Sequence, residues 1–451
     1  MTEQDELFDD FGGAAPGRSG PSLGAARLRQ ARRDQTELQA VDLESLLPPE
    51  HAARAVWAYV ELLDLSELTA QVRAREGAPG RAPVDPRILL ALWLYAATQA
   101  VGSARELARL CQAHAAYRWI CGGVTTNHHT LSDFRVSQEA LLDRLLAQGV
   151  TALEVEGLVK LERLAQDGVR IRASAGGGSF RSRGRLEKKL AEAEARIAVL
   201  KAELSGDPGA SRTRRQAAAE RTAREQAARA KAALGRMEQL EAERARRAKS
   251  HKSASKKQKP PRASTSDPQA RVMKMADGGF RPAYNGQLVS DPDTQVIVAV
   301  DVDDTGSDGG LMAPMVARIA GAYGRPPRQY LVDGGFIKLD DIEQLHGQGV
   351  EVFAPPPANK HNTDPLAQRD TDGPGVAAWR SRMASEAGQQ VYALRVKHEC
   401  VNAQARNRGA LQRLLVRGRN KVRCALLWFA VAHNLMRSLA LRATATQALQ
   451  A

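Results

Sequence analysis

The stretch GQQVYALRVKHECVNAQARNRG, residues 388–409, decides the fold. Its pattern predicts one helix whose positions i, i+3, i+7 and i+14 share a stripe and carry Tyr392, Arg395, Glu399 and Arg406. An aromatic ring, two cations and one carboxylate do not make a hydrophobic seam. One interpretation is a solvated helical face with a single ion pair. The other is a phosphate site, in which the carboxylate holds a metal ion and the other three side chains bind the polyanion.

The size and charge of the chain set the context for that helix. With 451 residues it is long enough for two or three domains with cores of their own. It carries 65 Lys and Arg against 51 Asp and Glu, a formal charge of +14, which favours a polyanionic partner: nucleic acid first, an anionic membrane second. Without an apolar run of about 18 residues or a signal pattern, we expect a soluble, cytoplasmic (nucleoid-associated) protein. Four cysteines without CxxC spacing are expected to be reduced core thiols.

The N-terminal third is predicted to be a tail followed by a bundle of helices. Residues 1–35 lack periodicity and are expected to be disordered. Residues 36–145 are interpreted as an all-helical domain, with start signals at Asp85-Pro86 and Ser103. Short helices joined by tight turns suit reading of the DNA major groove, although many helical bundles bind no DNA.

A strand and a long insertion are predicted next. Residues 164–173 alternate, and one face carries Asp167 together with apolar Val169, Ile171 and Ala173. The alternative role for Asp167 is a structural Asp-Gly turn. Residues 176–267 show apolar positions at steps of four and three, which predict a basic coiled-coil hairpin ending in a disordered basic tract. This insertion could contact DNA, mediate dimerisation or serve as a solvated spacer.

The remaining sequence, residues 146–175 with 268–451, is typical of an α/β domain. Short apolar strands at 296–302, 330–332 and 349–353 alternate with helices, which predicts a sheet with parallel members. Asp333 directly follows one of these strands, at the carboxyl end where functional groups gather. Four further acids, expected to serve turns and helix N-caps, are Asp301, Asp303, Asp304 and Asp308.

The stripe on residues 388–409 resembles the Tyr-Arg-Glu-Lys signature helix of DDE transposases from bacterial insertion sequences. Other runs resemble the same family: DPRILLALWLYA, SARELARLC, AYNGQ, WRSRM, NAQARNRG and HNLMR. Two departures are Val169, where the family often has threonine after Asp-Gly, and Arg406, which replaces the usual lysine. The resemblance implies an RNase H-like α/β core with a mixed sheet, an all-α N-terminal domain and a helical insertion.

The resemblance also implies cut-and-paste DNA transposition. Such an enzyme binds terminal inverted repeats, cleaves DNA and transfers strands, as a homodimer on double-stranded DNA. Asp167, Asp333 and Glu399 would then hold two Mg2+ ions, or Mn2+ in their place, because crowded carboxylates repel one another without cations. DNA phosphates would be held by Tyr392, Arg395 and Arg406, and the basic surface extended by Arg408, Arg417, Arg419, Lys421 and Arg423, which could also be a solvated helix face. The alternatives are a catalytically inactive DNA-binding relative that regulates transposition, and a coiled-coil scaffold.

Overall fold

The computed structural model describes residues 36, 40, 42–72, 74, 82–206, 214–250, 260–356, 364–407 and 411–450. From residue 43 onward the chain forms one compact unit. Three predictions lie outside the described residues: the disordered tail at 1–35, most of the basic tract after residue 250, and the role of Arg408.

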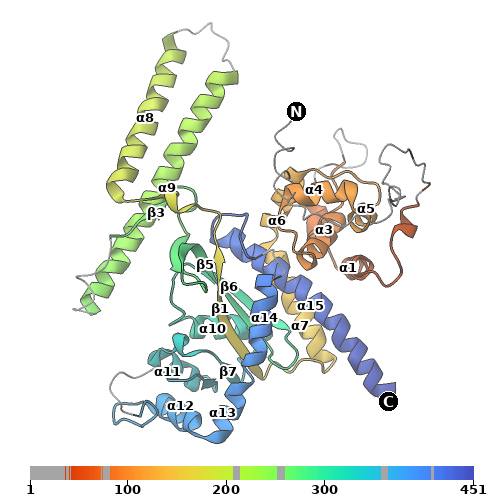
Figure 1. Ribbon diagram of the computed structural model, residues 1–451, viewed down its shortest axis with the longest axis vertical. Helices are drawn as coiled ribbons and strands as arrows, with labels where there is room; N and C mark the ends of the chain where they lie inside the picture. The colour runs from red at the N-terminus through yellow and green to blue at the C-terminus, as the bar shows by residue number, and fades with distance from the viewer. Residues whose placement is uncertain are drawn as a thin grey trace, which may run out of the picture. The chain divides into compact units, whose positions relative to one another are not determined.

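The first part of this unit is helical, as predicted. Its elements are η2 (Glu44–Leu46), α1 (Ala52–Glu61), α2 (Ser66–Ala70), α3 (Pro86–Thr98), α4 (Ala104–Ala113), α5 (Ala115–Cys121), α6 (His128–Ser137) and α7 (Glu139–Val155) (Figure 1). The Asp85 carboxylate accepts from the Arg87 N–H at 2.8 Å, and the Ser103 hydroxyl accepts from the Glu106 N–H at 3.3 Å. Both predicted start signals are therefore confirmed, since each side chain satisfies a backbone donor of its helix's first turn.

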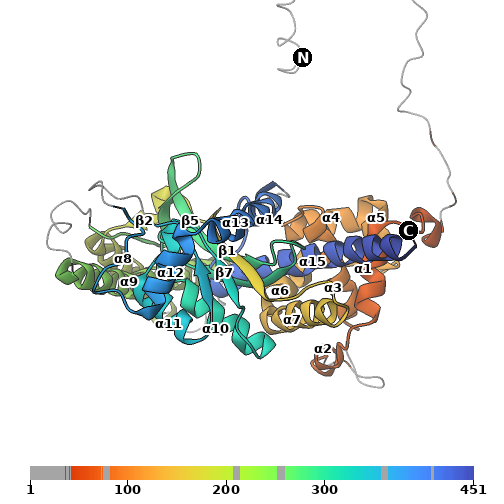
Figure 2. The same ribbon diagram turned by 90° about the horizontal axis from the view of Figure 1, so that it is seen from below.

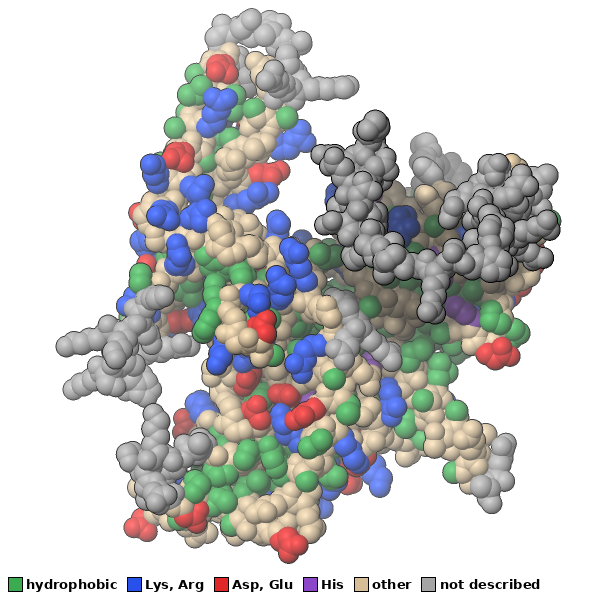
Figure 3. All heavy atoms as spheres, viewed as in Figure 1, with side chains coloured by type: hydrophobic (Ala, Val, Ile, Leu, Met, Phe, Trp, Pro, Cys, Tyr) green, Lys and Arg blue, Asp and Glu red, His purple; other side chains and the backbone are tan. Residues whose placement is uncertain are grey.

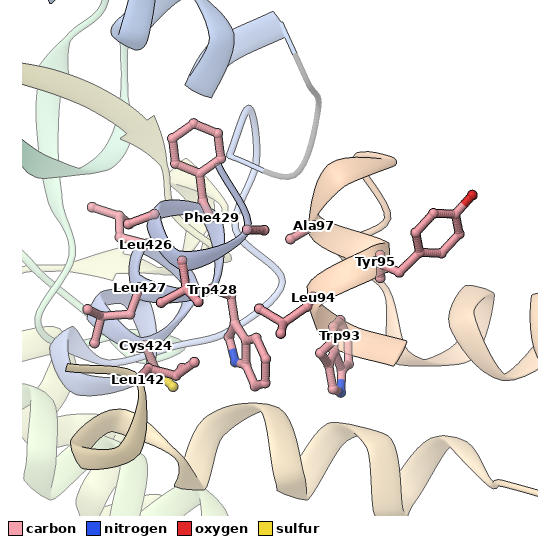
Figure 4. Close-up of a cluster of buried hydrophobic side chains, with 14 of the residues drawn as sticks. Trp93, Leu94, Tyr95, Ala97, Leu142, Cys424, Leu426, Leu427, Trp428 and Phe429 are labelled. Carbon is pink, nitrogen blue, oxygen red and sulfur yellow. The ribbon is translucent and has the colours of Figure 1, made fainter. Parts of the chain in front are cut away.

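A long C-terminal helix, α15 (Arg419–Gln450), joins these helices to the sheet. It lies alongside α3, α6 and α7 and also contacts the sheet (Figure 2). In Figure 4, Trp93 of α3 and Trp428 of α15 belong to one buried cluster, with ring centroids 6.4 Å apart. Their indole N–H groups donate to the carbonyls of Leu131 and Arg135, both at 2.9 Å. By length and composition α15 could cross a membrane, but 61% of its most apolar window is buried inside the protein, as in a core helix.

The sheet is mixed, which confirms the predicted α/β class. Its strands are β1 (Arg163–Arg172), β4 (Arg271–Lys274), β5 (Phe280–Ser290), β6 (Ile297–Asp303), β7 (Gln329–Leu331) and β8 (Glu351–Phe353). The order is β4-β5-β1-β7-β8, with β6 also paired to β5. β1, β7 and β8 are parallel, whereas β5 runs antiparallel to β1, β4 and β6. The predicted apolar face of β1 is buried at Val169, Ile171 and Ala173.

Five further helices pack against strands of this sheet. They are α10 (Met312–Tyr323), α11 (Leu339–Gly347), α12 (Pro374–Ala384), α13 (Glu386–Ala393) and α14 (Val396–Asn407). β5 was not predicted from the sequence, although it is the central antiparallel strand.

The cysteines are all free, but Cys400 is exposed, so it is not the core thiol that we expected.

The insertion forms two helices, α8 (Arg183–Gly206) and α9 (Arg214–Ser250), which lie side by side (Figures 1 and 2). Ion pairs between Lys231 and Glu194 at 3.0 Å and between Arg183 and Glu241 at 2.6 Å give them antiparallel directions. Two short strands, β2 (Phe180–Arg181) and β3 (Ala263–Ser264), pair at the base. The two predicted helices are therefore present and fold back on each other.

Candidate active site

Within the stretch 388–407 the chain forms parts of two helices, so the prediction of one continuous helix is wrong. α13 ends at Ala393 and α14 begins at Val396, with a turn between them. In that turn the Arg395 N–H donates to the Tyr392 carbonyl at 3.0 Å, a three-residue step that tightens the chain. Side chains of α13 pack on the core around β7 and β8, whereas Val401 and Ala405 of α14 pack on the core shared with α15. The two halves serve different cores, and the turn permits both contacts.

Asp167, within β1, and Asp333, just beyond the end of β7, occupy matching positions along two neighbouring parallel strands. The register between β1 and β7 pairs Ala165 with Leu331. Asp167 lies two residues beyond Ala165, and Asp333 lies two residues beyond Leu331. The structure therefore brings these two predicted acids together at the carboxyl end of the β1–β7 pairing.

The carboxylate of Asp167 is largely enclosed and has three partners. Its Oδ2 atom accepts from the Asn402 amide at 2.8 Å and lies 3.2 Å from the Arg395 guanidinium, while Oδ1 accepts from the Gly168 N–H at 2.8 Å. Burial raises the pKa of Asp167, Arg395 opposes that rise, and the nearby charges of Asp333 and Asp308 add to it. An acid whose charge is disfavoured in this way is stabilised by a cation.

Asp333 and Glu399 are more open. The Asp333 carboxylate accepts from the Gly335 N–H at 2.8 Å, where the chain turns into the short helix η5 (Gly334–Phe336). Glu399, in the first turn of α14, is 59% exposed, and its Oε1 atom accepts from Arg395 at 3.3 Å. The Arg395 guanidinium, 11% exposed, thus links the first and third predicted acids.

Tyr392 lies within electrostatic reach of all three acids. Burial raises the pKa of its phenol, Arg395 lowers it, and Asp333, Asp167 and Glu399 each raise it. Among the described residues, however, no group of three or more His, Cys, Asp or Glu side chains has the arrangement of a formed metal site. The donors suit Mg2+, which prefers oxygen ligands and binds through one or two carboxylates plus water and substrate phosphates. Asp167 and Asp333 fit that requirement, and Glu399 is paired with Arg395.

The predicted phosphate-binding cations divide into exposed and buried ones. Arg406 at the end of α14, Arg417 and Lys421 are exposed, as such a role requires. Arg423 is buried and pairs with Glu139 at 2.8 Å and Asp143 at 2.6 Å, so its assignment to a basic surface is wrong. A third carboxylate, that of Asp301 on β6, lies 3.6 Å from its guanidinium, so Arg423 links α15 to both α7 and β6. Arg419 lies 3.8 Å from the same Asp301.

The four further acids between residues 301 and 308 have structural partners. Asp308 accepts from Arg170 at 2.8 Å, from Asn285 at 2.7 Å and from Gln287 at 2.9 Å, all in a half-buried network. Asp303 accepts from the Thr305 N–H, which confirms a turn role, and Asp304 pairs with Arg236 of α9. The N-cap of α10 is Leu311, so the predicted N-cap role for these acids is wrong.

Two residues that position the site were missed. Asn402 holds Asp167, and His398 on the same helix contacts the Ser290 hydroxyl of β5 at 2.6 Å. Burial lowers the pKa of His398 to about 3, with Arg395 adding to the effect, so the ring is neutral at physiological pH. Both residues occur within residues 388–409, but their roles depend on which strand lies beneath the helix.

Two transposase family models match the chain. Residues 41–137 match a transposase domain (DUF772), and residues 244–435 match a transposase DDE domain. The second match includes Asp333 and Glu399, while Asp167 precedes it, on the far side of α8 and most of α9. These matches support a DDE transposase with an RNase H-like core, a class that acts on DNA with divalent metal ions. No curated protein matches the chain, and no solved structure matches it.

Proposed function

We propose that the protein is an insertion-sequence transposase that binds the terminal inverted repeats of its element and cuts and joins DNA, with Asp167, Asp333 and Glu399 as its catalytic acids. The observation that carries the proposal is the matched position of Asp167 on β1 and Asp333 just beyond the parallel strand β7, with Arg395 pairing with both Asp167 and Glu399. The partner is double-stranded DNA, and a homodimer would handle the two element ends together.

The acids would hold two Mg2+ ions, for which Mn2+ can substitute. Such ions, when bound, activate the attacking hydroxyl and stabilise the leaving oxygen. The chain's own residues prepare the site before that. Arg395 forms ion pairs with both Asp167 and Glu399, and Asn402 fixes the orientation of the Asp167 carboxylate.

DNA would change the partners of Arg395. A guanidinium binds a phosphate with paired, charge-assisted hydrogen bonds, so a DNA phosphate can replace the carboxylates as its partner. The acids would then be free to bind cations, and Tyr392 and Arg406 would hold the same strand. This arrangement couples the assembly of the site to the presence of its substrate.

The test is a nicking assay on DNA that carries the inverted repeats flanking the element. Wild type should cut only with Mg2+ or Mn2+, and Asp333→Ala should bind that DNA without cutting it. Asp340→Ala removes an exposed carboxylate from nearby α11 and is the matched control, expected to cut normally. Normal cutting by Asp333→Ala would remove the second acid from the proposal, and specific binding by a wild type that never cuts would favour the regulatory alternative.

A further inference from the structure

A cleft of about 680 Å³ opens beside Gly168, the residue that follows Asp167. One wall is the second half of β1, from Gly168 to Arg172. Another is the turn between β4 and β5, at residues 275–277, and the third includes Arg406 at the end of α14. The cleft therefore reaches the neighbour of one candidate acid, and its lining comes from β1, from β4 and the turn that follows it, and from the end of α14.

The lining of this cleft is strongly cationic. It contains one carboxylate, Asp277, and five cations, which are Arg170, Arg172, Lys274, Arg281 and Arg406. Figure 3 shows Lys and Arg side chains gathered on the visible face, over the strands at the foot of the α8–α9 hairpin. A cleft with this charge raises the local concentration of anions.

Two of the five cations are already neutralised within the protein. Arg170 pairs with Asp308 at 2.8 Å, and Arg281 pairs with Asp277 at 2.7 Å. Arg172, Lys274 and Arg406 are exposed, and in the part of the chain that the structure describes no carboxylate lies within ion-pair distance of them. Three unpaired cations on three separate elements repel one another, and an extended polyanion between them would relieve that repulsion.

We propose that this cleft binds the sugar-phosphate backbone of the DNA strand that leads away from the cleavage position, with Arg172, Lys274 and Arg406 each contacting a phosphate. The proposal rests on the proposed function and deepens it, because it assigns Arg172 and the β4–β5 turn to substrate binding. A DNA strand suits the cleft because its charges repeat along its length and the cleft reaches Gly168, directly next to Asp167. Contacts of this kind position the strand and carry no base information.

The experiment measures how the affinity for DNA depends on salt. Each phosphate contact contributes about −0.9 to the slope of log K against log salt concentration for duplex DNA. The probe is a fluorescein-labelled duplex of mixed sequence, titrated by fluorescence anisotropy with EDTA present so that nothing is cut. Arg172→Gln and Lys274→Gln should each make the slope shallower by about 0.9, and the double variant by about 1.8.

Two controls separate charge in the cleft from charge elsewhere and from misfolding. Lys160→Gln removes an exposed cation at the opposite end of β1 and should leave the slope unchanged. Lys274→Arg keeps the charge and should retain the wild-type slope, which a general structural defect at this position would not.

The inference is overturned if the double variant shows the slope and affinity of Lys160→Gln. Should wild type still nick DNA in that case, the cleft assignment fails alone. If wild type neither binds nor nicks DNA, the inference and the proposed function fail together.

Discussion

Replacement of Gly168 by alanine should destabilise the protein strongly, although both residues are small. A Cβ atom at this position would lie 2.5 Å from Asp308 Oδ1, 2.8 Å from Gln287 Nε2 and 2.9 Å from Asn285 Oδ1. All three are closer than carbon atoms approach such groups, so the network must move. Asp308 Oδ1 accepts hydrogen bonds from Asn285 and Gln287, and both would be distorted.

The expected cost combines two contributions. Overpacking a tight site costs about 1–3 kcal/mol, and each distorted hydrogen bond about 1 kcal/mol net. These contributions sum to about 3–5 kcal/mol, and because the clashing atoms are the ends of side chains we expect Gly168→Ala to lower the free energy of unfolding by the lower value, about 3 kcal/mol. Without a clash, alanine in a strand would instead stabilise by roughly 0.5–1 kcal/mol relative to glycine.

Urea unfolding, followed by far-UV circular dichroism, measures this effect. The matched control is Gly149→Ala in α7, where nothing lies within 4 Å of the added Cβ and a gain of roughly 0.5–1 kcal/mol is expected. A loss below about 1 kcal/mol for Gly168→Ala would refute the packing argument, because it would mean that the network yields without strain.

Three other predictions concern buried charge. Burial raises the pKa of Asp267, whose Oδ2 atom has no hydrogen-bond partner among the described residues. Because the pKa of Asp267 is raised in the folded protein, this residue's contribution to stability is complete only below the unfolded pKa of 3.8 and is lost as pH rises through the folded pKa. Asp267→Asn should therefore stabilise the protein at neutral pH and lose that advantage in acid. Burial alone would raise the pKa of Asp308, but hydrogen bonds from Arg170, Asn285 and Gln287 outweigh burial and lower it. Asp308→Asn should therefore destabilise the protein at neutral pH, and this loss of stability should shrink as pH falls through the folded pKa of Asp308. Unfolding measured between about pH 3 and 7 distinguishes these opposite signs. Finally, Arg423→Met should lower the free energy of unfolding by about 2 kcal/mol, less than for a fully buried ion pair because Glu139 and Asp143 are partly exposed. The matched control is Lys421→Met at an exposed position of the same helix, which should change the free energy of unfolding by less than about 0.5 kcal/mol.

Local patterns predicted those elements whose apolar residues follow a clear period. β1, β6, β7, β8 and the helices α3, α4, α7, α10 and α11 lie where alternation, helical spacing and capping residues placed them. β5 was missed because it breaks the expected pattern. It contains Pro282 and Gly286, and its polar Asn285 and Gln287 are fully buried in the network around Asp308. Gly286 is required there because a Cβ atom would lie 2.9 Å from side chains of Ile171 and Leu426.

The candidate site could be predicted only in its composition. The sequence identified Asp333 at a strand end and Asp167 on an apolar face, but their matched register depends on β1 and β7 becoming neighbours. The break between α13 and α14 at Leu394 and Arg395 also depends on distant residues, because α13 packs on one hydrophobic core and α14 packs on the other. The burial of Arg423 could not be read from its helix, since the carboxylates that surround it come from α7 and β6.

The paired strands at the base of the helical insertion have a consequence for how the chain reaches its native state. β1 must find β5 across roughly a hundred intervening residues, and closing so long a loop costs entropy. The antiparallel helices α8 and α9 can form from local contacts, and the pairing of Phe180 with Ser264 then brings the two ends of the insertion together. The remaining loop is about a quarter as long, which lowers the closure cost by roughly 1 kcal/mol. An insertion of this kind can therefore lengthen a sheet protein without slowing the search for its central pair of strands.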